Sequence, residues 1–494
     1  MSESQGGSVE KIRQDKEEKL ERLREAGLNP YPHTFERSAD SAQCIANSEA
    51  WIEEEREVQV AGRLMGKRVM GKTSFGHIQD ATGRLQLFFR RDNMDEDHYM
   101  RFRKLAEAGD HVGATGVLFI TKTGELSLRV KDWTMLSKAM LPLPEKFHGL
   151  TDQEIRARQR YLDLAVNPEV RSHFETRSRI FAFTRRFFEE HGFIEVETPA
   201  LQPLYGGANA RPFKTRHNAL DMDLYLRIAG GELYLKRLVT GGMEKVFEIG
   251  KVFRNEGMDR SHNPEFTMLE AYVAYWDYYP MMEFVENFYA SLARELHGGT
   301  KVNFGDQEID LAPPWPRLSY YEAVEKNTGK NLEGASRDEL AAFAKEKGLS
   351  IDDAWGWGKI LDEISGELVE PKLIQPTFLM DHPKEISPLA KDHRDKPGLV
   401  ERFEPFIAGF EVGNAFSELN DPIEQRRRFE SQMGLKAKGD EEAQVMDEDY
   451  IRALEVGMPP TAGLGIGMDR LVMLMTDTQH IRDVLLFPHM RPES

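Results

Sequence analysis

Hydrophobic and polar positions alternate in short runs between residues 56 and 145. This alternation predicts strands at 57–64, 74–80, 84–90, 114–121 and 126–135. A helix is predicted at about 96–108, between the third and fourth strands. Five strands with a helix at that place are typical of a small Greek-key barrel of the OB type. We therefore expect residues 56–145 to form an all-β OB-fold domain.

Different patterns flank this segment. Residues 9–26 are rich in Glu, Lys and Arg and have a thin apolar side, which predicts a helix that ends near Gly27. We assign residues 1–55 to an N-terminal helical extension. Pro142, Pro144 and Gly149 interrupt the pattern after the barrel and indicate a linker, which we place at 146–170.

Helical and extended patterns are mixed through residues 171–494. Helices are predicted at 177–190 and 283–296, and apolar strands at 246–253, 266–275 and 403–410. This mixture is typical of an α+β domain with a largely antiparallel sheet. Residues 328–370 are mostly helical, and we interpret them as an insertion packed on that sheet.

Charge and cysteine content narrow the class of protein. The net charge of −18 and the pI near 5.4 argue against a protein coated in nucleic acid. Within 56–145, however, Lys and Arg outnumber Asp and Glu, which hints at an anionic partner for this segment. The single cysteine, Cys44, excludes an intrachain disulfide and suits a reducing cytoplasm. The chain starts without a signal-peptide pattern, and no apolar run approaches the roughly 20 residues of a membrane span.

The segment 74–90 predicts a face suited to single-stranded bases. A tight turn between its two strands would pair Phe75 with Phe88 and His77 with Gln86, so these four side chains would share one face. Aromatic rings stack on bases and an amide reads a base edge. The alternative is an ordinary hairpin with surface aromatic residues.

A second group of polar residues belongs to two strands of the larger domain. Arg254 and Glu256 are two residues apart, which predicts a shared strand face, and Glu270 and Tyr272 repeat this spacing. The residues between them predict a loop that joins the strands as a long hairpin. Such a face suits a ligand with a phosphate and an amine, since Arg binds phosphate bidentately. A surface ladder of ion pairs is the alternative.

A third group surrounds a second predicted hairpin. If residues 408–409 form a two-residue turn, Glu404 and Glu411 lie on one face, diagonally adjacent. Two such close carboxylates repel each other unless a cation lies between them, and one or two carboxylates plus substrate phosphates commonly hold Mg²⁺. Solvated acids on an edge hairpin are the alternative. Glu418 follows in an apolar setting and requires a cationic partner.

The stretch 461–476 predicts a Gly-rich strand that runs into an apolar helix near Met468. Small residues allow a close approach of backbone to a ligand or to a packed helix. Arg470 would lie in the first turn of this helix, where a cation is unfavourable unless an anion binds there. A Gly-rich turn alone is more often structural than functional.

Three stretches together match one family. ETPALQP (197–203), FRNEG (253–257) with HNPEFTMLEAY (262–272), and GLGIGMDR (463–470) resemble, in order, the three motifs of class II aminoacyl-tRNA synthetases. The OB barrel is typical of the subgroup for aspartate, asparagine and lysine. YLKRLVTGGMEKVFEIG, HPKEISPLAK and EVGNAFSELND resemble the bacterial lysyl-tRNA synthetases in particular. The resemblance extends over nearly the whole chain.

The resemblance implies an activity and partners. The activity would be that of a lysine–tRNA ligase, which uses ATP and Mg²⁺ to activate L-lysine and then transfers it to tRNA(Lys). The family also implies a cytoplasmic homodimer, with residues around Pro199 at the interface, and a six-stranded antiparallel catalytic sheet flanked by helices. The helix at 9–26 is either a solvated surface helix or a contact for tRNA.

The resemblance also implies roles for individual residues. For ATP these are Arg254 on the α-phosphate, Glu256 on the adenine amino group, His262 near the outer phosphates, and Phe266 and Arg470 on either side of the adenine. The guanidinium of Arg470 would also face the γ-phosphate. Arg254 and Arg470 would be the catalytic residues, and Glu404 and Glu411 would hold Mg²⁺. For lysine they are Glu232, Tyr272 and Glu418 on the side-chain amine, Glu270 near the α-amine and Asn414 near the carboxylate. For the anticodon they are Phe75, Gln86 and Glu125.

One departure from the family is visible. The family commonly has one residue, often Pro, before the Glu that matches Glu232, whereas this chain has Gly230 and Gly231. We expect the extra residue to be absorbed before the helix that follows. We also expect Glu232 and Glu418 to form a buried acidic pair that only a substrate ammonium neutralises, because unpaired buried carboxylates cost several kcal/mol.

Three alternatives stay open. The nearest is a synthetase for aspartate or asparagine, but such a site needs a cation facing the substrate, and the predicted pocket is acidic. A paralogue that lysylates a protein generally lacks the barrel. A nucleic-acid-binding protein with a decayed catalytic domain would not keep Arg254, Glu256, Glu404, Glu411 and Arg470.

Overall fold

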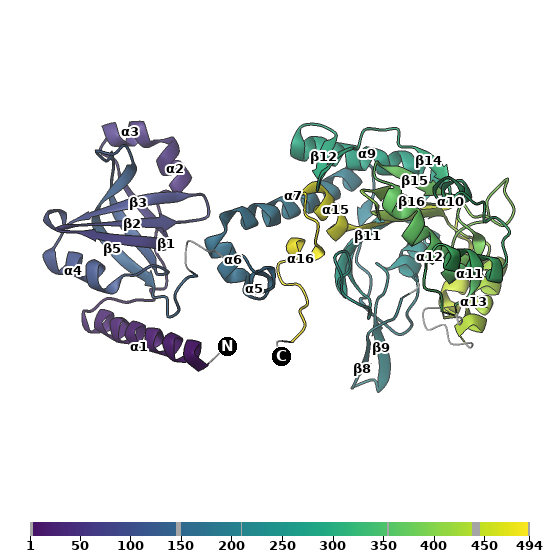
Figure 1. Cartoon of the computed structure of the whole chain (residues 1–494), viewed down its shortest axis with the longest axis horizontal. Coiled ribbons are helices and arrows are strands. Elements are labelled where there is room, and N and C mark those ends of the chain that lie inside the picture. The colour runs from purple at the N-terminus through teal and green to yellow at the C-terminus, as the bar shows by residue number, and fades with distance from the viewer. Residues whose placement is uncertain (1–2, 145–149, 209, 353–354, 437–444, 493–494) are drawn as a thin grey trace. The chain divides into compact units, whose positions relative to one another are not determined.

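The computed structural model describes residues 3–144, 150–208, 210–352, 355–436 and 445–492. The chain divides into two compact units, Met1–Thr151 and Asp152–Ser494 (Figure 1). The division falls within the segment predicted as the linker. The two units are described separately below.

The first unit is a closed five-stranded barrel with the strand order β1-β2-β3-β5-β4. Its strands are β1 (Glu57–Met70), β2 (Thr73–Gln79), β3 (Arg84–Arg90), β4 (His111–Ile120) and β5 (Leu126–Ser137). Helix α4 (Glu96–Leu105) lies between β3 and β4, and a 3-10 turn (Arg91–Asn93) precedes it. The predicted OB-type barrel is therefore confirmed, although β1 continues past its predicted end to Met70.

The β2–β3 hairpin has the predicted register. Phe75 lies opposite Phe88, and His77 lies opposite Gln86. The turn closes where Asp80 N–H donates to the Gly83 carbonyl at 3.0 Å. This pairing directs alternate side chains of the hairpin into the barrel and leaves the others on its outer face.

Three helices precede the barrel strands: α1 (Glu3–Glu25), α2 (Ser41–Ala46) and α3 (Ser48–Glu53). Leu23 of α1 and Cys44 of α2 are fully buried in the barrel's hydrophobic core. Polar contacts also hold α1, since Lys19 pairs with Glu107 at 2.6 Å and Lys16 donates to the Ala139 carbonyl at 3.1 Å. The N-terminal helices thus belong to the same compact unit as the barrel.

The second unit is built on a nine-stranded sheet within the described residues, in the order β14-β15-β16-β18-β19-β11-β10-β6, with β17 paired to β16. Six neighbouring strands, from β15 to β10, are antiparallel, while the edge strands β14 and β6 are parallel to their neighbours. The bounds are β6 (Ile194–Glu195), β10 (Lys245–Phe253), β11 (Glu265–Ala274), β14 (Arg317–Ser319), β15 (Thr377–Met380), β16 (Arg402–Ile407), β17 (Phe410–Glu411), β18 (Gly413–Ser417) and β19 (Thr461–Gly467). The expected antiparallel core is present inside a mixed sheet.

Helices cover the sheet (Figure 1). Side chains of α7 (Pro168–Glu190), α9 (Tyr278–His297) and α15 (Met468–Met475) pack with the sheet in the largest hydrophobic core. Helices α10 (Tyr320–Thr328), α11 (Arg337–Glu346) and α12 (Trp357–Leu368) form a second core with Leu379 of β15 and Phe406 of β16. The predicted insertion is therefore helical and packs on the sheet.

Shorter elements complete the second unit. They are helices α5 (Gln153–Arg158), α6 (Arg160–Val166), α8 (Glu232–Thr240), α13 (Pro422–Lys436), α14 (Glu448–Gly457) and α16 (Ile481–Val484), strands β7 (Leu201–Gln202), β8 (Lys214–His217), β9 (Met222–Leu226), β12 (Lys301–Phe304) and β13 (Gln307–Asp310), and 3-10 turns at Glu370–Lys372 and Lys384–Ile386. None of the helices in the described part of the chain combines the length and hydrophobicity that a membrane span requires.

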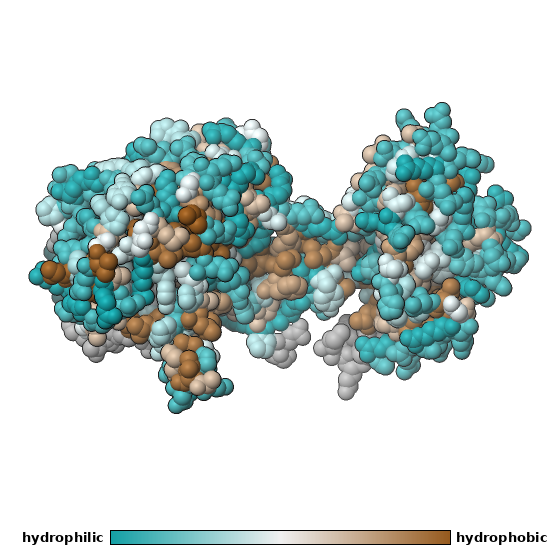
Figure 2. Space-filling model, turned by 180° about the vertical axis from the view of Figure 1, so that it is seen from behind, coloured by the Kyte–Doolittle hydropathy of each residue, from teal (hydrophilic) through white to brown (hydrophobic). Residues whose placement is uncertain are grey.

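Large hydrophobic side chains remain exposed on the second unit. They include Tyr161, Ile194, Leu201, Leu204, Leu220 and Phe487. Figure 2 shows hydrophobic surface interrupting the hydrophilic surface on the face turned toward the viewer. Exposed apolar residues that are scattered singly are ordinary on a protein surface, whereas a contiguous patch would mark a contact with another molecule.

Candidate active site

The five residues predicted to bind ATP line one cavity of about 170 Å³. Arg254, Glu256, His262 and Phe266 come from β10–β11 and their connecting loop, and Arg470 comes from the first turn of α15. Glu411 lines the same cavity. Segments more than 200 residues apart in the sequence are therefore brought together around one space large enough to receive part of a ligand.

The predicted strand face for Arg254 and Glu256 is wrong. Strand β10 ends at Phe253, so both residues lie in the loop that follows. The Arg254 amide donates to the Pro264 carbonyl at 2.9 Å, across the base of that loop. The Arg254 guanidinium lies 5.2 Å from the centre of the Phe266 ring, and its Nε donates to the Ile228 carbonyl at 3.2 Å. Loop geometry, rather than strand alternation, therefore directs Arg254 into the cavity.

Arg470 and His262 meet at the cavity wall. Arg470 Nη1 donates to the Glu411 carbonyl at 2.7 Å, and Nη2 lies 3.1 Å from His262 Nε2. The ring of His262 also contacts the Asp259 carboxylate through Nδ1 at 2.8 Å. These contacts hold a cation and an imidazole beside each other on the surface that would face an anionic ligand.

Glu404 and Glu411 occupy the predicted hairpin. Phe406 pairs with Glu411, and Ala408 and Gly409 form the turn with φ of 56° and 80°. Burial works to raise the pKa of Glu404, but Arg402 and His382 lower it to about 2. Burial and the charge of Glu404 raise the pKa of Glu411 to about 7. The two carboxylates are thus close enough to disfavour a second negative charge when no cation is bound.

This pair fits a divalent cation shared with a substrate. Among the described residues, no group of three or more His, Cys, Asp or Glu side chains is arranged to hold a metal ion by itself. Magnesium is commonly bound by one or two carboxylates together with substrate phosphates. Glu404 and Glu411 supply that number of protein ligands, and Glu411 lines the cavity predicted for ATP.

The two acids predicted to bind the lysine side chain, Glu232 and Glu418, are paired with a lysine of the protein itself. Lys236 of α8 is fully buried, and its Nζ lies 2.7 Å from Glu232 Oε1 and 2.6 Å from Glu418 Oε2. The expectation of a pair that only a substrate neutralises is therefore wrong. Burial opposes the charged form, but Glu232 and Glu418 raise the pKa of Lys236 above its usual value. The two acids do converge on one point, as predicted.

Two carboxylate oxygens beside this ion pair remain unpaired. Glu418 Oε1 and Glu270 Oε2 are buried and have no hydrogen-bond partner in the described part of the chain. Burial, followed by the charge of Glu232, raises the pKa of Glu270 to about 8. Burial likewise raises the pKa of Glu418 to about 8, although Lys236 opposes this shift. A cationic ligand would satisfy both oxygens and lower both pKa values.

A glycine lies beside each of these two acids, Glu418 and Glu270. A Cβ at Gly463 would overlap Glu418 Oε1 and lie 2.7 Å from the Tyr272 ring. A Cβ at Gly230 would lie 2.9 Å from the Glu270 carboxyl carbon. The Gly230 amide also donates to Glu270 Oε1 at 2.5 Å. The unusual two-glycine turn therefore contributes a hydrogen-bond donor that a proline could not supply.

Gly230 and Gly231 lie in the turn that precedes α8. Gly231 precedes α8 with φ of 103°, in the left-handed region that favours glycine. Glu232 is then the first residue of α8, and its exposed fraction is 7%. The two glycines thus form the turn, and Glu232 begins the helix.

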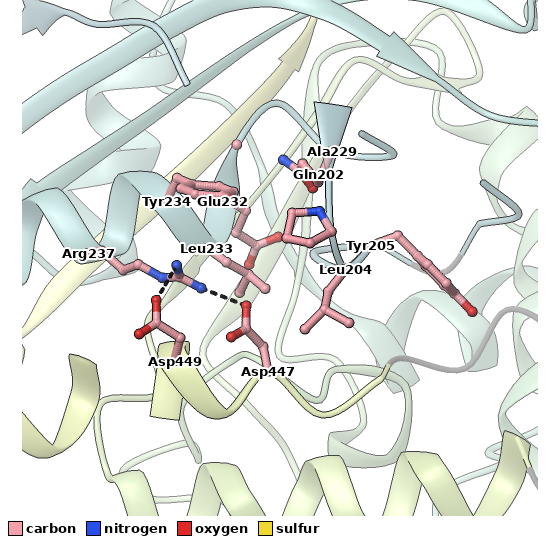
Figure 3. Close-up of a pocket in the computed structure, with 13 residues that line it drawn as sticks. Gln202, Leu204, Tyr205, Ala229, Glu232, Leu233, Tyr234, Arg237, Asp447 and Asp449 are labelled. Atoms are coloured by element: carbon pink, nitrogen blue, oxygen red, sulfur yellow. Dashed lines mark hydrogen bonds and ion pairs between the residues drawn. The ribbon is translucent and has the colours of Figure 1, made fainter. Parts of the chain in front are cut away.

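A second cavity of about 220 Å³ lies against Glu232. Figure 3 shows Arg237 with Asp447 and Asp449 on one side of it, and Leu204 and Tyr205 on the other. Arg237 pairs with both aspartates, at 2.6 and 2.7 Å. The lining of these two cavities does not include Glu270, Tyr272 or Glu418, which are almost completely buried.

Asn414, predicted to lie near the lysine carboxylate, is on β18. Its Oδ1 accepts a hydrogen bond from Arg402 Nε at 3.0 Å, and its backbone pairs with Gly465 of β19.

Sequence reasoning did not predict Arg402, His382 or Lys236. For Lys236 a signal existed, because it follows Glu232 by four residues on a predicted helix, a spacing that favours an ion pair.

Aromatic rings form a row on the barrel strands for which base binding is predicted. The rings of Phe75 and Phe88 are 5.2 Å apart, and Phe119 of β4 continues this row 5.4 Å from Phe88. Arg129 lies 4.8 Å over Phe119. Beside the row, Gln86 donates to Ser127 Oγ at 2.7 Å. Glu125, the third predicted residue, contacts His77 Nε2 at 3.1 Å.

Comparison with known proteins gives the family. Residues 152–491 match the family model described as tRNA synthetases class II (D, K and N), and residues 58–136 match the OB-fold nucleic acid binding domain. The chain is 52% identical to the lysine–tRNA ligase of Roseiflexus castenholzii, over 98% of this chain and 99% of the relative. It is 54% identical to the lysine–tRNA ligase of Moorella thermoacetica, over 96% and 97%. This chain therefore belongs to the class II tRNA synthetases, within the lysine–tRNA ligases.

Proposed function

We propose that this protein activates L-lysine with ATP to give lysyl-adenylate and pyrophosphate, and then transfers lysine to the 3′-end of tRNA(Lys). The lysine carboxylate, which is ionised at neutral pH, attacks the α-phosphorus and needs no protein base. Pyrophosphate leaves, and the 3′-hydroxyl of the tRNA later displaces AMP. The protein contributes position and charge rather than a covalent nucleophile.

The observation that carries this proposal is the pair of unpartnered carboxylate oxygens, Glu418 Oε1 and Glu270 Oε2. Both are buried, and Tyr272 lies close to both carboxylates. We assign the side-chain ammonium of lysine to Glu418 and Tyr272, with Glu232 nearby, and the α-ammonium to Glu270. Asn414 would then face the substrate carboxylate. A neutral side chain would leave the Glu418 oxygen unsatisfied, which costs about 1–3 kcal/mol or more.

The cavity beside α15 would hold ATP. We assign Arg254 to the α-phosphate, Glu256 to the adenine amino group, and His262 and Arg470 to the outer phosphates. Phe266 would contact the adenine, and the positive charge of Arg254 and Arg470 would offset the negative charge that develops on phosphorus. Glu404 and Glu411 would hold Mg²⁺, which supplies further charge compensation for the phosphates when bound.

The barrel would read the anticodon. We assign Phe75 to base stacking, and Gln86 and Glu125 to hydrogen bonds with base edges. The row formed by Phe75, Phe88 and Phe119 supports this assignment, because successive rings suit successive unstacked bases.

We further propose that the protein acts as a homodimer in the cytoplasm. The exposed hydrophobic residues of the second unit support self-association, and they include Leu201 and Leu204, which follow Pro199 closely. Gel filtration with light scattering would test this. A monomer at micromolar concentration would refute the dimer.

Amino-acid-dependent ATP–pyrophosphate exchange, measured with each of the twenty amino acids, tests the proposed activity. We expect exchange with lysine and at most weak exchange with other amino acids. Exchange driven by aspartate or asparagine would refute the choice of lysine. Exchange with lysine but no charging of tRNA would instead favour a paralogue with another acceptor.

A further inference from the structure

Lys236 provides an ammonium group inside the region assigned to the substrate's side-chain ammonium. Its Nζ pairs with Glu232 and Glu418 at 2.7 and 2.6 Å. Three aromatic rings surround it, with Nζ 5.7 Å from the centre of Tyr272, 5.3 Å from Phe416 and 5.8 Å from Tyr450. Acidic and aromatic groups from four segments thus enclose this ammonium.

The contacts of Glu418 distinguish two positions for an ammonium. Its Oε2 faces Lys236, whereas its Oε1 faces Gly463 and Tyr272, has no hydrogen-bond partner among the described residues, and gains space from the missing Cβ. One carboxylate can therefore bind a resident ammonium through one oxygen and an arriving ammonium through the other.

Lys236 changes the net charge of the subsite for the lysine side chain. Glu232 and Glu418 would together carry two negative charges, and Lys236 offsets one of them. One substrate ammonium then neutralises the remainder. Without Lys236, a single ammonium would leave an uncompensated carboxylate in a buried site, which strongly favours uptake of a proton.

We propose that Lys236 is a specificity-determining and positioning residue that stays in place when lysine binds and sets the charge of the side-chain subsite to match one ammonium. This inference rests on the proposed function. Lys236 acts through Glu418 and Glu232: it offsets one of their two charges and, by pairing with Glu418 Oε2, leaves Glu418 Oε1 for the substrate. It is absent from the set of residues that the motifs assign to lysine.

Proton release on lysine binding tests this role directly. The charged and titratable groups around Lys236 are Glu232 on the same helix, Glu418 after β18, Glu270 and Tyr272 on β11, and Tyr450 on α14. Removal of the Lys236 charge should raise the pKa of Glu418 further, because Lys236 opposes the effect of burial on this carboxyl group. The empty site would then hold more protons and release them when lysine enters.

The test compares wild type with Lys236→Met, which removes the charge at similar volume. Calorimetric titration of lysine at pH 9, where a carboxylate with a pKa of about 8 is mostly ionised in the wild type, counts the protons released in buffers with different ionisation enthalpies. We expect Lys236→Met to release up to one proton more than wild type. In the wild type, the lysine KM should fall as pH rises. In Lys236→Met this fall should occur at higher pH, while the ATP KM should stay within about twofold of the wild-type value.

Two further variants make the outcome decisive. Lys236→Met/Glu232→Gln restores the charge balance, so its proton count should return toward the wild-type value. Lys236→Arg keeps the charge, so its pH profile should keep its position even if its affinity for lysine falls. If Lys236→Met does not fold, the Lys236→Arg profile alone decides, and a shifted profile would overturn the proposal.

A matched control is Lys138→Met in the barrel. Lys138 is also buried and paired with two acids, Glu107 and Asp110, at 2.9 and 3.0 Å. The Lys138→Met variant should leave the proton count and the lysine KM unchanged.

Equal loss of affinity for lysine and ATP in Lys236→Met, with unchanged proton release, would show that Lys236 has a structural role only. Wild-type protein without lysine-dependent exchange would instead refute the proposed function.

Discussion

At the scale of residues, the acidic groups could be predicted, whereas the only signal for their cation, Lys236, was its spacing of four residues from Glu232. Glu270 and Glu418 were identified because each carboxylate stands in an apolar stretch of sequence, where an unpaired charge is costly. Lys236 lies in an ordinary helical pattern, in which a lysine is usually solvated. Only the tertiary fold brings α8 and the segment after β18 together around its ammonium. Burial of a residue depends on such long-range contacts, which local patterns do not contain.

Substitution Glu418→Gln should raise the lysine KM about 10- to 100-fold, because a hydrogen bond to a charged group contributes roughly 1.5–3 kcal/mol. The ATP KM should change little, since Glu418 does not line the ATP cavity. Steady-state ATP–pyrophosphate exchange measures both constants. The exposed Glu430→Gln serves as the control. An equal rise in both constants would contradict the assignment of Glu418 to lysine.

Gly463→Ala should affect the same site by size alone. The new methyl group would overlap Glu418 Oε1 and crowd Tyr272. Overpacking of this kind commonly costs about 1–3 kcal/mol. We expect a higher lysine KM and a lower melting temperature. Gly434→Ala is the control, because nothing lies within 4 Å of its Cβ position. Unchanged lysine kinetics in Gly463→Ala would show that the site relaxes around the methyl group.

At the scale of elements, the alternation of hydrophobic and polar residues predicted the positions of strands better than the residues at which they end. The β2–β3 and β16–β17 registers follow from short turns, in which two residues fix the pairing. Arg254 and Glu256 were placed on a strand because alternation in sequence continues past Phe253, where the sheet pairing stops. The edge strands β6 and β14 are two and three residues long, too short to show a period. Their parallel pairing was accordingly not predicted.

The ion pairs of Glu107, one of them with Lys19 of α1, should make the stability of the barrel unit depend on pH. Burial works to raise the pKa of Glu107, but hydrogen bonds from Lys19 and Lys138 lower it to about 2. A group with a lowered folded-state pKa contributes stability above its unfolded value, near 4.3, and loses it as pH falls toward 2. We therefore expect Glu107→Gln to be less stable than wild type at pH 7.

Thermal melts followed by circular dichroism between pH 7 and pH 2.5 would measure this difference. The gap between wild type and Glu107→Gln should narrow as pH falls below about 4. Glu53→Gln, which changes an exposed acid in the same unit, should behave like wild type throughout. A gap that is constant with pH would exclude the proposed contribution of the Glu107 charge.

At the scale of the whole molecule, the chain places two kinds of recognition in two compact units. The length of the chain and the change of pattern near residue 145 predicted this division. The predicted charge difference between the units also follows from composition. The roles of individual barrel residues come from the family resemblance rather than from the pattern, because an OB barrel serves many ligands.

The substitution Phe75→Ala should weaken tRNA charging and leave lysine activation intact. Loss of one stacked base costs roughly 1–3 kcal/mol, so the KM for tRNA charging should rise about 5- to 150-fold. Lysine-dependent ATP–pyrophosphate exchange should stay within twofold, since it does not involve the anticodon. Ile45→Ala, an exposed apolar residue of the same unit, is the control. A matching loss of exchange would contradict a separate base-reading role.

The only cysteine of the chain also has a consequence for experiments on the whole molecule. Cys44 is fully buried in the barrel core, and burial raises the pKa of its thiol to about 11. Such a thiol is protonated and shielded at neutral pH, so maleimide reagents would not modify it. A cysteine introduced on the surface of either unit would then be labelled alone, without removal of a native residue. Fluorescent reporters of tRNA arrival could thus be attached to an otherwise unaltered enzyme.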